Sequence, residues 1–424
     1  MRRTFLKQLF FLGALWGPTQ KGFSFFDPQY QPALGFLNNT TDGKPTRKDW
    51  VLEPHITYLN NGTMGVSPRV VLQTTQEQMH KADALGVYGG GEKALLDVLS
   101  QFFSVVPQSL ALTHNVTEGT NIILSGLPLN KHDEIVCTDH EHAGTAIPLL
   151  IKAQQSGAKL KVAAIDTNPE KTTQNILNAI SSKTKLVCIP HMPCTIGQVL
   201  EVQNLAQACR QRGVLTLIDG AHPPGMIQVN LSELGCDFYT GCGHKWMLGP
   251  KGTGFLYVNP SALNRLNLSF TGAGTHNTYT LNTSTQELPL PAEGARRFYF
   301  GSQNAGLYYG LASAAEFLLH AVGMEYVEKH TRDLALWARN QIQKHIPGAH
   351  FFCPDDPQFR AGVTAFSIEG IDSQKLCSNL RSKNIIVRHV HENQLDIVRV
   401  STHIYNNEED IERLISEIKA FIKA

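Results

Sequence analysis

From about residue 70 onward, short apolar segments alternate with longer segments whose apolar residues recur every three to four positions. The short segments are typical of buried strands and the longer ones of amphipathic helices. Because strands alternate with helices, we expect a mostly parallel sheet that is covered on both faces. Helices are predicted over 70–84, 92–103, 121–124 and 199–212. Strands are predicted over 109–113, 134–138, 161–165, 185–189, 215–218, 237–240 and 254–258.

The C-terminal part follows a different pattern. A long helix over 324–345 precedes strands at 362–368, 385–390 and 397–401, and a last amphipathic helix begins at Glu408. This order predicts a smaller α+β domain after the α/β domain. The expected organisation is a signal segment (1–30, with an approximate end), an N-terminal arm (31–69), a large domain (70–320) and a small domain (321–424).

The N-terminus begins with the basic segment Arg2-Arg3-Thr4-Phe5-Leu6-Lys7, and an apolar run over 9–16 follows it. A basic segment before a short apolar run is typical of an export signal. The order resembles a twin-arginine (Tat) signal, although Met1 stands where a Ser or Thr is usual. We therefore expect export by the Tat machinery to a bacterial periplasm. The alternative is a basic-apolar N-terminus without a signal function.

Composition excludes some classes of partner. The 424-residue chain has 37 Lys and Arg against 36 Asp and Glu, a net charge of +1, and therefore lacks the basic excess of a nucleic-acid-binding protein. None of its eight cysteines forms a C-x-x-C pair, so neither a zinc site nor a disulfide framework is expected. We interpret them as buried thiols that pack as small hydrophobic groups.

Polar residues with useful chemistry stand where the predicted strands end. They are Thr117 in 114–121, His142 in 138–144, Asp219 and His222 in 218–222, and Lys245 in the glycine-rich segment 241–252. Because the carboxyl ends of parallel strands share one edge of a sheet, we expect these side chains to meet in a ligand-binding crevice. A lysine buried there is costly unless it is neutralised.

Each of these segments also has an ordinary structural interpretation. Lys245 alone would be a solvated lysine, Asp219-Gly220 a turn, and 114–121 a helix N-cap. Asp139, His140 and Glu141 are residue types that can bind a metal ion. Adjacent residues in a loop are poorly placed to bind one ion together, so no metal site is predicted.

Taken together, the order and spacing of these segments resemble the class V aminotransferase family of fold-type I pyridoxal-5′-phosphate (PLP) enzymes. That family includes cysteine desulfurases, kynureninase and isopenicillin N epimerase-like proteins. The resemblance covers roughly residues 50–424 and includes 58–65, 301–304 and 399–406. It implies a large domain with a seven-stranded, mostly parallel sheet, a small C-terminal α+β domain, PLP as cofactor and a homodimer that shares its active site.

The resemblance also assigns roles. Lys245 would be the catalytic residue and would carry PLP as a Schiff base, Asp219 would pair with the ring nitrogen and His222 with the phenolic oxygen. Substrate would be bound by Asn61 and by Arg399, whose guanidinium would clamp the α-carboxylate. The remaining cofactor-binding residues would be His142 on the ring face, Val116, Thr117 and His244 at the phosphate, and Ser302 at the phosphate of the neighbouring subunit.

Two departures from the family pattern bear on the reaction. The stretch 388–396 contains no cysteine, so the thiol of a desulfurase is missing, and Cys194 stands where desulfurases have an asparagine. The leading hypothesis is therefore an isopenicillin N epimerase-like enzyme that moves a Cα proton on an amino acid or a derived metabolite, by epimerisation or transamination, as in the tailoring of a secreted siderophore. The alternatives are a C–S or C–C lyase and a non-catalytic PLP-binding module.

Overall fold

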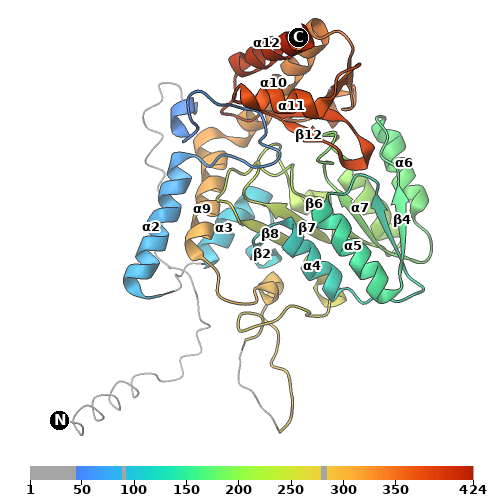
Figure 1. Cartoon of the computed structure of the whole chain (residues 1–424). Helices are drawn as coiled ribbons and strands as arrows, with labels where there is room; N and C mark the ends of the chain where they lie inside the picture. The colour runs from blue at the N-terminus through green and yellow to red at the C-terminus, as the bar shows by residue number, and fades with distance from the viewer. Residues whose placement is uncertain (1–43, 88–91, 278–283, 424) are drawn as a thin grey trace, which may run out of the picture.

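The computed structural model describes residues 44–87, 92–277 and 284–423; the expected signal segment and the start of the arm lie outside them. A seven-stranded sheet with the order β2-β8-β7-β6-β5-β3-β4 forms the centre of the molecule (Figure 1). Its strands are β2 (Leu110–Thr113), β3 (Glu134–Thr138), β4 (Lys159–Ala163), β5 (Thr184–Pro190), β6 (Leu215–Gly220), β7 (Phe238–Cys242) and β8 (Gly254–Val258).

Five neighbouring strands of this sheet, β4, β3, β5, β6 and β7, are parallel. Only β8 runs antiparallel to its neighbours β7 and β2. The mostly parallel seven-stranded sheet confirms the predicted fold class. It also gathers the carboxyl ends of β3, β5, β6 and β7 at one edge, as the position of a ligand site requires.

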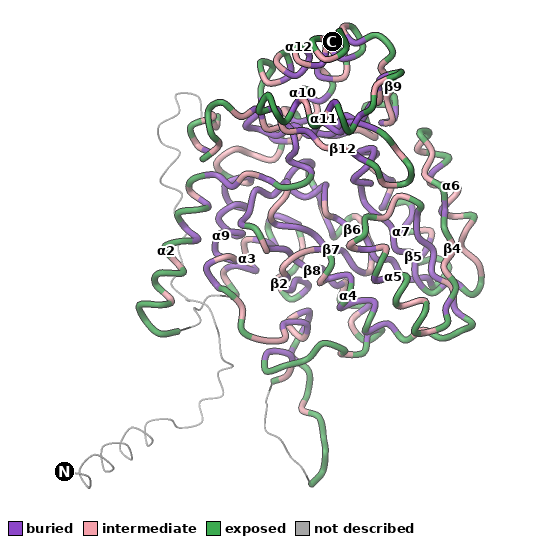
Figure 2. Tube along the Cα trace, in the orientation of Figure 1, coloured by how far each residue is buried: buried purple, intermediate pink, exposed green. Residues whose placement is uncertain are grey.

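Both faces of the sheet are buried. In β5, Leu186 and Cys188 pack into one apolar cluster and Val187 and Ile189 into another, because successive side chains of a strand point to opposite faces. The first cluster also includes side chains of α4 (Val116–Gly126) and α5 (Ala143–Ser156). The second includes side chains of α3 (Glu92–Phe103), α6 (Pro169–Ala179), α7 (Val202–Gln211) and α9 (Ala305–Glu316). Figure 2 shows the buried strands and the buried α9, with partly exposed helices such as α4, α6 and α7 around them.

The small domain is built on a four-stranded antiparallel sheet with the order β12-β13-β10-β9. Its elements are α10 (Met324–His345), β9 (Ala349–Phe351), β10 (Val363–Ile368), α11 (Ser373–Ser382), β12 (Arg388–Val390), β13 (Ile397–Ser401) and α12 (Glu408–Lys423). The long helix, the strand at 397–401 and the helix from Glu408 are confirmed as predicted.

The expected single strand over 385–390 is wrong, because it is split between two sheets. Ile385–Ile386 forms β11, which pairs in parallel with β1 (Thr57–Tyr58) of the N-terminal arm, whereas β12 pairs with β13. Leu59, the next residue of the arm, is fully buried in the core of the small domain. The arm is therefore attached to the small C-terminal domain. In the sequence it precedes α2 (Arg69–Leu85), the first helix of the large domain.

Other predicted boundaries also shift. The helix expected at 121–124 begins at Val116, because the Asn115 side chain accepts from Glu118 N and caps it there. The helix expected from residue 199 begins at Val202, with Glu201 in the N-cap position, and Val199 N and Leu200 N donate to the carbonyls of Phe359 and His191. The strand expected at 161–165 is β4, whose register against β3 moves it two residues earlier.

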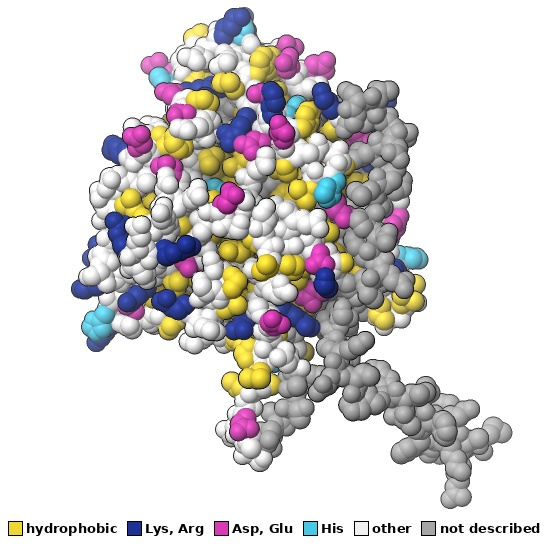
Figure 3. Space-filling model, turned by 180° about the vertical axis from the view of Figure 1, so that it is seen from behind, with side chains coloured by type: hydrophobic (Ala, Val, Ile, Leu, Met, Phe, Trp, Pro, Cys, Tyr) yellow, Lys and Arg dark blue, Asp and Glu magenta, His cyan; other side chains and the backbone are white. Residues whose placement is uncertain are grey.

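Acidic and basic side chains are interspersed on the face of the molecule that Figure 3 shows, in keeping with the near-zero net charge. Within residues 44–87, 92–277 and 284–423, no helix combines the length and the apolar character needed to cross a bilayer.

Candidate active site

Lys245 and His222 lie next to each other just beyond the ends of β7 and β6. Lys245 Nζ is 3.4 Å from His222 Nε2, and His222 Nδ1 accepts a 3.2 Å hydrogen bond from the indole N–H of Trp246. Burial holds the pKa of His222 well below its usual value, and the positive charges of Lys245 and Arg399 lower that pKa further. The structure therefore sets a neutral imidazole against the amine of Lys245.

Asp219 is buried at the end of β6 with both carboxylate oxygens hydrogen-bonded. Oδ1 accepts from Ala221 N at 2.9 Å, and Oδ2 accepts from the Thr145 hydroxyl at 2.7 Å. Thr145 belongs to the first turn of α5, which begins directly after His142. Two donors from different segments thus fix the orientation of the carboxylate.

The segments around Thr117 and His142 touch at the N-termini of α4 and α5. A Cβ atom on Gly144 would lie 2.5 Å from Thr117 Oγ1 and 3.1 Å from His142 Nδ1, so only glycine fits between them. His142 caps α5 through Nδ1, which accepts from Gly144 N. Burial and the nearby charge of Lys245 lower the pKa of His142. Val116, the first residue of α4, accepts from the Thr240 hydroxyl through its carbonyl. The N-terminus of α4 is thus a suitable place for an anionic group.

Arg399 is fully buried in β13 and is held by three hydrogen bonds. Nη1 donates to the Cys194 carbonyl at 2.7 Å, and Nη2 donates to Asn60 Oδ1 and Thr63 Oγ1. Cys194 therefore meets Arg399 through its backbone. The Arg399 side chain also borders Gly62, where an added Cβ would lie 3.2 Å from Nη2.

Gly62 lies between Arg399 and His222, and Asn61 precedes it. The same Cβ on Gly62 would lie 2.9 Å from Ser401 Oγ and 3.2 Å from His222 Cε1. Asn61 Oδ1 accepts from the Tyr405 hydroxyl at 2.7 Å. Asn61 Nδ2, Arg399 Nε and Ser401 Oγ are buried and have no protein partner among the described residues. Because buried polar atoms are rarely left unpaired, this cluster fits a site that takes a polar ligand.

Two predicted cofactor residues stand apart from this group. His244 lies directly before Lys245, and its Nδ1 is 3.0 Å from the Thr253 carbonyl while its own carbonyl accepts from Gly65 N. Ser302 is exposed, and no described hydrogen bond joins it to the other site residues. Its expected contact with a neighbouring subunit stays a prediction.

Three residues near the site were missed by sequence reasoning. Thr145 bonds Asp219, Trp246 bonds His222, and Arg388 faces the site from β12. Arg388 stands opposite Arg399 in the strand register, forms an ion pair with Glu392, and its charge lowers the pKa of both nearby histidines, His142 and His222. The sequence could have indicated Thr145, because its hydroxyl stands three residues after His142. The position of Arg388 near the site follows only from the pairing of β12 with β13.

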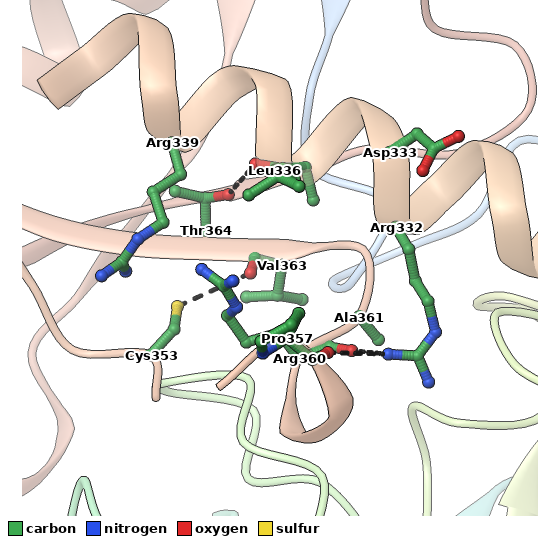
Figure 4. Close-up of a pocket in the computed structure, with 11 residues that line it drawn as sticks. Arg332, Asp333, Leu336, Arg339, Cys353, Pro357, Arg360, Ala361, Val363 and Thr364 are labelled. Carbon is green, nitrogen blue, oxygen red and sulfur yellow. Dashed lines mark hydrogen bonds between the residues drawn. The ribbon is translucent and has the colours of Figure 1, made fainter. Parts of the chain in front are cut away.

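The small domain has a separate pocket between α10 and β10 (Figure 4). Arg332 and Arg339 reach it from one helix, and they pair with Glu328 and Asp355. It contains none of the predicted site residues. Within the described part of the chain, no cluster of three or more His, Cys, Asp or Glu side chains could hold a metal ion.

Comparison with known proteins agrees with this geometry. Residues 93–414 match the model of the family described as aminotransferase class V. Isopenicillin N epimerase of Streptomyces clavuligerus is 28% identical over 398 residues, which are 89% of this chain and 98% of that protein. A probable cysteine desulfurase of Halalkalibacterium halodurans is 29% identical over 320 residues, 72% of this chain and 76% of that protein.

Among solved structures, a C-DES mutant with glycine covalently linked to its PLP cofactor superposes with a TM-score of 0.80 at 25% identity, over 88% of this chain and 99% of that one. The family match spans most of the chain, from α3 to α12, and includes all seven strands of the central sheet. The chain therefore belongs to the class V aminotransferase family, whose members depend on PLP.

Proposed function

We propose that this protein is a PLP-dependent enzyme that moves a proton at the α-carbon of an amino acid or an amino-acid-derived metabolite. The observation that carries the proposal is the position of Lys245, whose amine lies 3.4 Å from His222 Nε2 at the same sheet edge as Asp219. When bound, PLP supplies an electron sink for charge that develops on the substrate. Lys245 would hold it as a Schiff base and later act as the proton carrier.

The residues at the strand ends fit PLP in kind and in place. Asp219, held by two donors, supplies the carboxylate that would keep the ring nitrogen protonated. Thr117 and the N-terminus of α4 supply donors for a phosphate, and the imidazole of His142 lies beside them. Arg399 and Asn61 would bind the substrate carboxylate, using Arg399 Nε and Asn61 Nδ2, which the protein leaves unpaired.

The segment that begins with β12 favours proton transfer at Cα over the persulfide mechanism of a cysteine desulfurase. The stretch 388–396 carries the Arg388–Glu392 ion pair and no cysteine, so a persulfide mechanism lacks its thiol. The near full-length similarity to an isopenicillin N epimerase supports the same choice.

A lyase is the second candidate, because a probable cysteine desulfurase is an equally similar relative. A panel of amino acids separates the two activities. Racemised amino acid or a transferred amino group supports the proposed reaction. Release of pyruvate, ammonia or sulfide would replace it with the lyase.

The assignment of Lys245 is tested by trapping the cofactor. Wild-type protein reconstituted with PLP and reduced with borohydride should carry label on the peptide that contains Lys245. Lys245→Ala should carry none. Lys251→Ala is the matched control, because Lys251 is a second lysine of the same loop, is exposed, and donates from its amine to the Gly65 carbonyl. Label that persists in Lys245→Ala would refute the assignment.

The proposal includes a homodimer in which Ser302 reaches the cofactor phosphate of the neighbouring subunit. Leu288 and Leu290, in the segment before Ser302, are 86% and 77% exposed, more than the other exposed large apolar side chains of the described residues. Sedimentation should give a dimer, and Leu288→Ser with Leu290→Ser should weaken it. A monomer that binds PLP as tightly as any dimer would remove this part of the proposal.

The proposal also places the enzyme in the periplasm, where it would tailor a secreted metabolite such as a siderophore. The support is the order of residues 2–16, which lie outside the described residues.

A further inference from the structure

We propose that Trp246 is a positioning residue that fixes His222 as the neutral tautomer with its proton on Nε2. The Nε2–H of His222 is then directed toward Lys245, and the ring has no free lone pair with which to act as a base. The consequence for chemistry rests on the proposed function, because His222 and Lys245 belong to the predicted cofactor site.

The bond between Trp246 and His222 decides the tautomer. An indole N–H is a donor only, so the His222 Nδ1 atom, 3.2 Å away, must be an unprotonated acceptor. A neutral imidazole carries one N–H, which must then be on Nε2, 3.4 Å from Lys245 Nζ. Without the indole, either ring nitrogen could carry the proton.

A second proton on the ring is opposed by the surroundings. His222 is 2% exposed, and burial makes the largest contribution to the lowering of its pKa. The charges that act on it, from Lys245, Arg399, Arg388 and His142, are all positive or potentially positive and lower it further. An imidazolium would also place a proton on Nδ1 against the indole N–H. One protonation state is therefore left to His222.

Glycine lies beside both rings of the His222–Trp246 pair. A Cβ on Gly62 would lie only 3.2 Å from His222 Cε1, so the glycine backbone sits close to that edge of the imidazole. Trp246 is fully buried, and a Cβ on Gly362 would lie 2.9 Å from its ring. Glycine on both sides lets the backbone come close to the two rings.

Trp246 is held in turn by a second histidine of defined tautomer. His403 Nδ1 accepts from Ile404 N at 2.7 Å, so its proton is on Nε2, which donates to the Trp246 carbonyl at 2.9 Å. The rings of His403 and Trp246 stack with their centroids 5.6 Å apart, and burial lowers the pKa of His403 to about 4. His403 follows β13, the strand of Arg399, so the small domain helps to set the donor that faces Lys245.

The arrangement divides the work between two residues. His222 offers a fixed N–H to an acceptor beside Lys245, such as the cofactor oxygen that the family resemblance assigns to it. It has no free lone pair with which to remove a proton from Lys245 or from a substrate. Proton transfer is then left to Lys245.

The first test reads the tautomer directly in the apoprotein. Selective ¹⁵N-histidine labelling and two-bond ¹⁵N–¹H spectra, assigned with His222→Gln, should show a protonated Nε2 and an unprotonated Nδ1 across the neutral pH range. Trp246→Phe should produce a mixture of tautomers and a higher His222 pKa. Trp50→Phe is the matched control, because Trp50 is as deeply buried and its indole donates to the Val66 carbonyl. A proton on Nδ1 of wild-type His222 would overturn the proposal, even if Trp246→Phe fails to fold.

The second test is a double-mutant cycle on cofactor affinity and on the pH dependence of the bound-cofactor spectrum. Trp246→Phe should weaken PLP binding about tenfold, the size expected for one lost hydrogen bond. A glutamine amide keeps its N–H donor whether or not Trp246 is present. In the His222→Gln background, Trp246→Phe should therefore have little further effect on PLP affinity. Additive losses would show that Trp246 acts through packing alone and would overturn the proposal.

The two tests separate this inference from the function on which it rests. If wild-type protein takes up no PLP, the proposed function fails, while the apoprotein spectra still report the tautomer. If PLP binds but His222 shows the other tautomer, the function survives and the role of Trp246 is lost.

Discussion

The Thr145 hydroxyl donates a 2.7 Å hydrogen bond to Asp219 Oδ2, across 74 residues of sequence. The donor lies in the first turn of α5 and the acceptor at the end of β6, so the bond links two strand ends on which the site depends. Its partner oxygen, Oδ1, accepts from the backbone of Ala221, which no side-chain replacement removes. Of the two hydrogen bonds to Asp219, the one from Thr145 is therefore the bond that a side-chain substitution can remove.

Thr145→Val keeps the shape of the side chain and removes this bond. We expect PLP affinity to fall about tenfold, because the carboxylate that would face the ring nitrogen loses one of its two donors. Equilibrium titration of apoprotein with PLP measures the effect. Thr120→Val is the control, since the buried Thr120 hydroxyl has no partner among the described residues and its loss should leave affinity unchanged. Equal behaviour of the two variants would contradict the prediction.

Arg399→Met should destabilise the apoprotein by about 2–4 kcal/mol, because it leaves the buried Cys194 carbonyl without its donor and removes two further hydrogen bonds, to Asn60 Oδ1 and Thr63 Oγ1. Urea unfolding measures this loss. Arg388→Met is the matched control, since Arg388 occupies the facing position of the strand register but is partly exposed and has Glu392 as its ion-pair partner. Its cost should be smaller than that of Arg399→Met. In the reconstituted enzyme, Arg399→Met should also raise KM for an α-amino acid; an unchanged KM would place the substrate carboxylate elsewhere.

Glu141 should make the folded protein less stable as pH rises from mildly acidic to neutral. Burial raises the pKa of this carboxyl to about 8, and the charge of Asp219 adds to the increase, while hydrogen bonds from Thr138 oppose it. At these pH values the folded protein keeps a proton on Glu141 that the unfolded chain has lost. The contribution of Glu141 to the free energy of unfolding is therefore largest below its pKa in the unfolded chain. It decreases as pH rises, until pH passes its pKa in the folded protein.

Glu141→Gln removes this proton linkage and should flatten the dependence of unfolding free energy on pH between about 4.5 and 8. The exposed Glu53→Gln should leave the wild-type slope in place. Denaturant unfolding at several pH values compares the three proteins. The same slope in wild type and Glu141→Gln would show that Glu141 is ionised in the folded state.

The cysteines should be unreactive in the native protein. All eight are free thiols; seven are buried, and burial raises the pKa of the half-buried Cys377 to about 12. Because the thiolate is the reactive form, alkylation at pH 8 should be slow and should leave activity intact. In denaturant all eight should react. Rapid inactivation by one alkylation event would point to a catalytic thiol and to the lyase.

Replacing the twin arginines tests the export proposal. Arg2→Lys with Arg3→Lys should retain the protein in the cytoplasm, because Tat recognition depends on the arginine pair. Lys7→Gln keeps the pair and should still be exported. Cell fractionation with a cytoplasmic marker reports the outcome; periplasmic recovery of the double variant would remove the Tat proposal.

The sequence by itself determined the architecture of the large domain and the types of residue in the site. Apolar runs bounded by glycine and polar residues specified the strands, because a buried parallel strand must be apolar on both faces. The polar residue that ends each run then lies at the edge where the strands converge. Lys245, Asp219, His142 and Thr117 are therefore candidate site residues on the sequence alone.

Tertiary structure decided how those residues are held and which partners complete them. Strand register set Arg388 opposite Arg399, and split the segment 385–390 between two sheets, because β1 from the arm pairs with its first half. Trp246 and Thr145 reach His222 and Asp219 through hydrogen bonds between distant segments. The periodicity of apolar residues does not reveal such bonds, because it indicates only which side of a helix or strand is buried.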